Sequence, residues 1–83
     1  MTNENPRRPL LSEITTGARV VFRGVDAGRG LTSRLAALGL VAGAHLEVLQ
    51  NSRRGPVLVR VHNTRVALGH NEARKVIVKE IEQ

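Results

Sequence analysis

Short runs of alternating hydrophobic and polar residues dominate this chain, and alternation with a period of two residues predicts β-strands. In the stretch 18–25, Ala18, Val20 and Phe22 fall on one side of the predicted strand, and Val25 falls on the opposite side. Five stretches show the pattern, at 18–25, 45–50, 57–61, 65–68 and 76–81. We expect these strands to close into a small β-barrel, because closure leaves few strand edges exposed.

A helical period replaces the alternation in residues 31–38. Leu31, Leu35 and Leu38 lie at positions i, i+4 and i+7, so they share one face of a short helix that we expect to cover the barrel. Gly39 suits the left-handed residue that follows a helix. In a Schellman ending, Leu40 folds back onto Leu35.

Turn residues separate the remaining elements. Gly43 stands at the position of a type II turn over residues 41–44 that requires a positive φ. We predict a hairpin loop at 51–55 and a tight reversal at 63–64. Two further helical turns are predicted, one near residues 11–14 and one near 70–74. In the second, Asn71 is the expected N-cap and Ala73 the inward residue.

Composition indicates one small domain. The chain has 83 residues, of which 41% are apolar, and Phe22 is its single aromatic residue, so the core must consist of Val, Leu, Ile and Ala. Residues 1–9 are polar, contain two prolines and show no periodicity, which predicts a disordered tail. Residues 10–83 are expected to form a single barrel domain.

Several function classes are excluded or disfavoured. Cysteine is absent, which removes disulfides, thiolate metal ligands and cysteine nucleophiles. The longest uncharged apolar run, 38–44, is far shorter than the roughly 20 residues that span a bilayer, and no signal peptide is visible, so we expect a soluble cytosolic protein. Asp26 is the single aspartate, and no serine has a recognisable His–Asp partner. These features predict a protein that is not an enzyme and that needs no cofactor.

Histidines offer a weak metal-binding alternative. His45 and Glu47 are two residues apart on a predicted strand and share its outer face, and His62 lies on the next hairpin. Two or three nitrogen and oxygen ligands could meet there. Their spacing matches no established metal signature, so an ordinary solvated strand face is the favoured interpretation and no metal site is predicted.

The net charge of +6 allows binding to nucleic acid. The arginines that could form a basic surface are Arg23, Arg34, Arg53, Arg54, Arg60 and Arg65. Small barrels that bind nucleic acid usually add aromatic residues that stack on bases, and this chain has none outside its core. A basic barrel that contacts phosphates is therefore retained as the alternative function.

The segment Leu38-Gly39-Leu40-Val41 contains more apolar side chains than a thin core can bury. These side chains either cap the open end of the barrel or form an apolar notch on the surface, and a notch of this kind often marks a protein-binding site. We expect a partner to contact this corner and a basic strand face, through Arg34, Leu38, Leu40, Val41, Arg60 and Arg65, since apolar residues beside arginine are enriched in interfaces.

Across residues 9–81 the sequence resembles the FeoA family. The segments that carry the resemblance are Pro9–Ile14, Gly17, Arg34–Gly43, Val57–Val61, Thr64–Leu68, Ala73 and Val76–Val78. One departure is Ala42, where the family usually has proline. The resemblance implies an SH3-like β-barrel that binds rather than catalyses. It also implies an accessory protein of ferrous iron uptake, recruited to the inner membrane by the cytosolic part of a FeoB-like transporter; weak self-association is left open.

Overall fold

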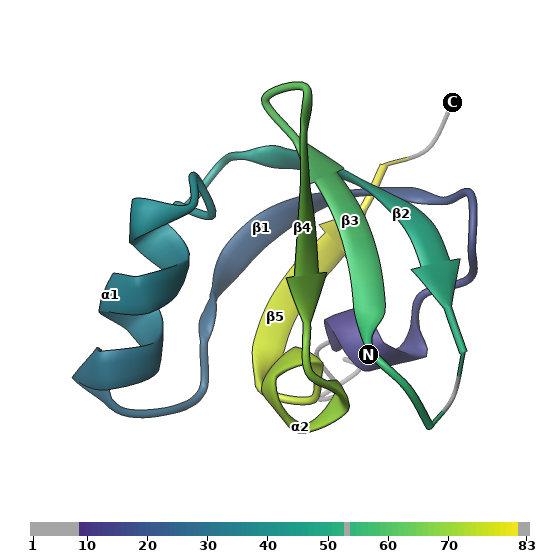
Figure 1. The fold of residues 1–83 in the computed structure, drawn as a ribbon. Helices are drawn as coiled ribbons and strands as arrows, with labels where there is room; N and C mark the ends of the chain where they lie inside the picture. The colour runs from purple at the N-terminus through teal and green to yellow at the C-terminus, as the bar shows by residue number, and fades with distance from the viewer. Residues whose placement is uncertain (1–8, 53, 82–83) are drawn as a thin grey trace, which may run out of the picture.

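Five antiparallel strands form one sheet in the order β4-β3-β2-β1-β5, and three short helical segments complete the fold (Figure 1). The computed structural model describes residues 9–52 and 54–81. Its elements are η1 (Leu11–Glu13), β1 (Arg19–Val25), α1 (Arg29–Ala37), β2 (His45–Asn51), β3 (Val57–Val61), β4 (Thr64–Leu68), α2 (His70–Ala73) and β5 (Val76–Glu80). The predicted mainly-β class, with five strands and three helical segments, is confirmed.

The sheet curls strongly but does not close as predicted. Irregular register between Phe22 and Gly24 in β1, and between Val48 and Gln50 in β2, bends these two strands, as β-bulges do. Among the described residues no backbone pairing joins β4 to β5; α2 connects these strands (Figure 1). The outer edge of β5 is covered instead by the segment before η1, through a bridge from Leu10 to Ile77.

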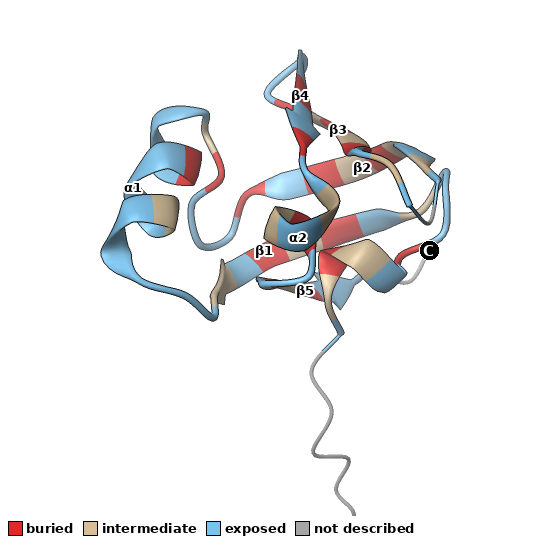
Figure 2. Ribbon diagram, turned by 60° about the horizontal axis from the view of Figure 1, so that its bottom comes forward, coloured by how far each residue is buried: buried red, intermediate tan, exposed pale blue. Residues whose placement is uncertain are grey.

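The core contains apolar residues alone in the described part of the chain, as composition predicted. Figure 2 shows the buried residues alternating with exposed ones along the strands. The fully buried side chains are Leu11, Leu35, Leu40, Leu46, Leu68, Val20, Val48, Val57, Val59, Val61, Val76 and Val78, and Ile14, Phe22 and Ala73 are also buried. Val25, placed on the outer face by simple alternation, packs partly against the core because the β1 bulge shifts the pattern by one residue. Residues 1–8 of the expected tail lie outside the described residues.

The predicted three-leucine face of the helix is only partly correct. α1 begins two residues earlier than expected, at Arg29, and ends at Ala37. Leu35 is fully buried and Leu31 is partly buried, but Leu38 is 45% exposed. Leu38 is the C-cap, with φ −93° and ψ 2°. Because the helix ends before it, its side chain does not lie on the same face as Leu31 and Leu35. Two leucines, rather than three, attach α1 to the sheet.

Two local predictions are wrong. The β3–β4 reversal is centred on His62 and Asn63, not on residues 63–64, with φ values of 51° and 64°. Two consecutive positive φ angles are typical of a type I′ hairpin turn, and Asn and His tolerate this conformation better than most residues. The N-cap of α2 is Gly69 rather than Asn71, and the Glu72 carboxylate accepts a hydrogen bond from the Gly69 amide at 3.0 Å.

Candidate functional site

A Schellman motif fixes the end of α1, as the sequence predicted. Gly39 has φ +97°, the amide of Leu40 donates to the Leu35 carbonyl at 3.0 Å, and the amide of Gly39 donates to the Ala36 carbonyl at 3.0 Å. Leu40 is consequently buried beside Leu35, with 1% of its surface exposed. Leu40 is therefore a core residue, and it presents almost no surface to a partner.

A second turn follows at once. The amide of Ala44 donates to the Val41 carbonyl at 2.9 Å, and Gly43 has φ +92°, as predicted for residues 41–44. Two consecutive turns thus hold Leu38 and Val41 in fixed positions on the surface. In the described part of the chain these two are the large hydrophobic residues that are exposed, at 45% and 47%. We call them the apolar corner.

Arg34, which the sequence placed beside this corner, is paired with another side chain of the same chain. Its guanidinium forms an ion pair with the carboxylate of Glu72, whose other oxygen caps α2. The Arg34 side chain is 60% exposed, so the pair stabilises the fold by less than about 1 kcal/mol. Arg34 links α1 to α2 and still presents charged surface one helical turn before Leu38.

Arginines also line up across the outer face of the sheet. The strand register pairs Arg19 with Glu47, Glu47 with Arg60, and Arg60 with Arg65, so these four residues cross β1 to β4 in one row. Adjacent strands lie about 4.8 Å apart, so the row extends about 14 Å. Arg60 donates to Glu47 at 3.1 Å. We call Arg19, Arg60 and Arg65 the arginine row; the sequence had identified Arg60 and Arg65 but not Arg19.

The weak metal-ligand candidates lie in this same region. His45, Glu47 and His62 line a shallow depression of about 240 Å³, together with Arg19 and Arg60. Glu47 is paired with Arg60, and the guanidinium groups would repel a cation. Within residues 9–52 and 54–81 no group of three or more His, Cys, Asp or Glu is arranged to hold a metal ion.

The apolar corner and the arginine row are neighbours on the surface. A methyl group added at Gly39 would approach Cδ2 of His62 to 2.9 Å, so the end of α1 lies directly against the β3–β4 turn. His62 shares the shallow depression with Arg19 and Arg60. These distances bring the segment between Leu38 and Leu40 close to His62, which borders the arginine row; a partner-binding surface made of both stays a prediction.

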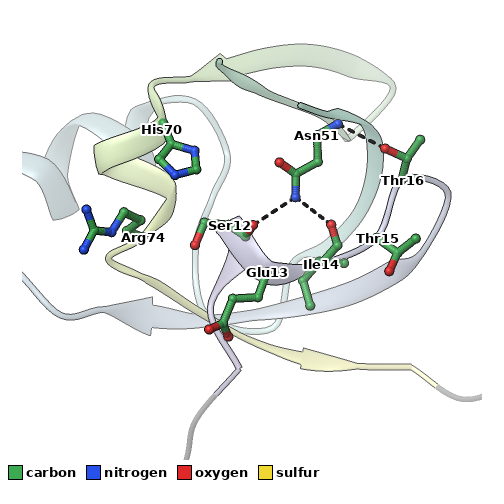
Figure 3. Close-up of a pocket in the computed structure, with 8 residues that line it drawn as sticks. All are labelled: Ser12, Glu13, Ile14, Thr15, Thr16, Asn51, His70 and Arg74. Atoms are coloured by element: carbon green, nitrogen blue, oxygen red, sulfur yellow. Dashed lines mark hydrogen bonds between the residues drawn. The ribbon is translucent and has the colours of Figure 1, made fainter. Parts of the chain in front are cut away.

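A polar pocket on another part of the molecule was missed by sequence reasoning. It has a volume of about 630 Å³ and is lined by Ser12, Glu13, Ile14, Thr15, Thr16, Asn51, His70 and Arg74 (Figure 3). Asn51 had been assigned to a loop, and His70 had been given no role. The long sequence separation between these residues left no local pattern that could have grouped them.

None of the helices in the described part of the chain is long and hydrophobic enough to cross a bilayer.

The family model and the similar protein both indicate the FeoA family. The family model described as FeoA domain matches residues 10–80. A protein of Methanocaldococcus jannaschii named "Putative Fe(2+) transport protein A" is 33% identical over 66 residues, which cover 80% of this chain and 79% of that protein.

Two solved structures are similar in fold and in sequence. The FeoA protein of Chlorobium tepidum is 33% identical, with a TM-score of 0.81 over 89% of this chain and 71% of its own. The FeoA protein of Stenotrophomonas maltophilia, solved in complex with zinc, is 32% identical, with a TM-score of 0.75 over 86% of this chain and 89% of its own. The latter is described as a procaryotic SH3 domain protein with a suggested role as a ferrous iron transport activating factor.

Proposed function

The chain belongs to the FeoA domain family, and from this membership we propose that it is an accessory protein of ferrous iron transport that docks on the cytosolic part of a FeoB-type transporter. The mode of action is binding rather than catalysis. The observation that supports the proposal is the close approach of Gly39 to the His62 ring, which brings the segment that carries Leu38 near the edge of the arginine row.

The apolar corner is suited to binding because it is already ordered. Two turns with internal hydrogen bonds hold Leu38 and Val41 in place, so little conformational entropy is lost when a partner covers them. Full burial of a Leu or Val side chain contributes about 1.5–3 kcal/mol, and about half of each is available here, so the pair contributes about 2 kcal/mol. That free energy corresponds to a factor of about 30 in the dissociation constant.

The arginine row supplies the electrostatic part of the interaction. Arg19 and Arg65 are exposed, and Arg60 is held by Glu47. An acidic surface on the transporter would be attracted to this row, which mainly increases the association rate and disfavours basic partners. Docking in this manner places the protein in the cytoplasm, at the inner membrane while it is bound. The exposed Leu38 and Val41 also allow weak self-association at high concentration.

Binding to the isolated cytosolic domain of the transporter tests the proposal. We expect the loss of apolar contact in Val41→Arg or Leu38→Arg to weaken binding by about fivefold for each variant. The total effect should be larger, since each variant also introduces a charge that needs water. Ser33→Arg is the matched control, because it adds the same charge at an exposed position of α1 outside the corner. Isothermal titration calorimetry measures the dissociation constants. Equal affinity for all three folded variants and the native protein would exclude the apolar corner as the contact.

A further inference from the structure

Three charged side chains of alternating sign line one hollow on the outer face of the sheet. Arg19 of β1, Glu47 of β2 and Arg60 of β3 are register partners across adjacent strands. All three line the shallow depression of about 240 Å³, so they share one surface although the sheet curls. Across three strands this surface therefore carries a positive, a negative and a positive charge.

Each of the three charged groups is still available to a partner. Arg60 donates through Nη1 to Oε1 of Glu47 at 3.1 Å, and these side chains are 40% and 38% exposed. Within the described residues Oε2 of Glu47 accepts no hydrogen bond and Arg19, which is exposed, forms no ion pair. All three can thus meet an opposite charge from outside while the internal contact is kept.

The alternating signs disfavour a ligand of uniform charge. A nucleic-acid backbone presents negative phosphates alone, so a strand laid along these residues would bring a phosphate against Glu47. A continuous acidic surface meets the same repulsion. The complementary partner presents a negative, a positive and a negative group in that order.

The spacing of the three charges matches the face of an α-helix. Adjacent strands are about 4.8 Å apart, so the second and third charges follow the first by about 4.8 and 9.6 Å. On one face of a helix, residues i+3 and i+7 follow residue i by about 4.5 and 10.5 Å. Side chains on one face of an extended segment recur about every 6.7 Å, so its third charge would lie about 4 Å too far along.

We propose that the depression receives a helix of the partner protein, laid across the strands, with acidic residues at positions i and i+7 and a basic residue at i+3. The acidic residues face Arg19 and Arg60, and the basic residue faces Glu47. This inference deepens the proposed function and rests on it, since the FeoB-type transporter is the expected source of the helix. Charge pairs of this kind fix the register of a partner more than they add affinity.

Two peptides of the same composition test the pattern on the native protein. Each is a helix of about 20 residues with a hydrocarbon staple on the face opposite the charges, so that both stay helical. The matched peptide carries Glu, Lys and Glu at i, i+3 and i+7, and the swapped peptide carries Lys, Glu and Glu. Nuclear magnetic resonance titration at low ionic strength, where surface charges are least screened, gives the dissociation constants. We expect the matched peptide to bind about tenfold more tightly, because the swap places like charges against Arg19 and Glu47.

A charge-swapped variant of the protein provides the reciprocal test. Arg19→Glu combined with Glu47→Lys keeps the net charge but reverses the signs on β1 and β2. This variant should prefer the swapped peptide by a similar factor, and a gain of affinity cannot result from unfolding. Ser33→Arg, at an exposed position of α1 outside the depression, should keep the native preference.

Equal affinity of the native protein for both peptides, or binding of neither, would overturn the proposal. So would tighter binding of an extended peptide that carries the same three charges at every second residue. Binding to the cytosolic domain of the transporter is measured separately. If that domain binds but the peptides are not distinguished, the helix is refuted and the proposed function stands. If the peptides are distinguished but that domain does not bind, the site stands and the transporter is refuted as its partner.

Discussion

Replacement of Gly39 by alanine tests how the end of α1 is joined to the sheet. Gly39 has φ +97°, where an L-residue costs about 1–2 kcal/mol. Its new methyl group would also lie 2.9 Å from Cδ2 of His62, closer than carbon atoms normally approach. Gly43 is a matched control, because it has φ +92° but no heavy atom within 4 Å of the place that an alanine methyl group would take. Gly43→Ala therefore measures the backbone cost alone.

We expect Gly43→Ala to lower the free energy of unfolding by about 1 kcal/mol and Gly39→Ala by about 2 kcal/mol, since His62 must also move. His62→Gly should remove the excess, because it deletes the ring while glycine tolerates the φ of 51° at that position. Urea unfolding of Gly39→Ala, of His62→Gly and of the variant that combines them gives the coupling energy between the two positions. Equal losses for Gly39→Ala and Gly43→Ala, or an excess that persists without His62, would refute the contact.

Three further outcomes follow from the geometry. Asn51→Ala should lower the free energy of unfolding by about 1–3 kcal/mol in urea titrations, because the Ser12 and Ile14 carbonyls lose their donor; an unchanged midpoint would contradict this. In a double-mutant cycle, Arg34→Gln and Glu72→Gln should show a coupling energy below about 1 kcal/mol, and 1 M salt should decrease it. A larger coupling energy that does not change with salt would contradict the interpretation of this pair as a surface contact. Affinity for a random DNA duplex should be weak. The logarithm of the binding constant should fall with the logarithm of salt concentration with a slope of about −3, if the three guanidinium groups of the arginine row each neutralise a phosphate. Sub-micromolar affinity at physiological salt would favour the nucleic-acid alternative.

The sequence predicted well those parts of the fold that depend on residues close together in the chain. Alternation places residues such as Val57, Val59 and Val61 in the core, and all three are buried. Gly39 and Gly43 were assigned positive φ angles from the turns that contain them, and both have them. Periodicity and turn chemistry act over a few residues, so they can be read from one sequence.

The parts that were missed depend on contacts between distant segments. Leu38 keeps the helical spacing, but its exposure follows from where the helix ends. Arg19 joins the arginine row only through the β1–β2 register, and Asn51 bonds Ser12 of η1 from 39 residues away. Of the proposed contact residues, Leu40 is buried, whereas Leu38, Val41 and Arg65 are exposed. A single sequence does not specify such pairings.

The contact between the apolar corner and the transporter can be tested most directly by photo-crosslinking in cells. A photoreactive phenylalanine analogue at Val41 should form a covalent adduct with the FeoB-type transporter, because this side chain is exposed at the centre of the proposed interface. The same analogue at Ser33, exposed on α1 outside the corner, should give little or none. An adduct at Val41 that contains the transporter, and that disappears when Leu38 is also changed to arginine, is the result that the account predicts. A transporter adduct formed equally at Ser33, or none at Val41 in a folded and expressed protein, would contradict it.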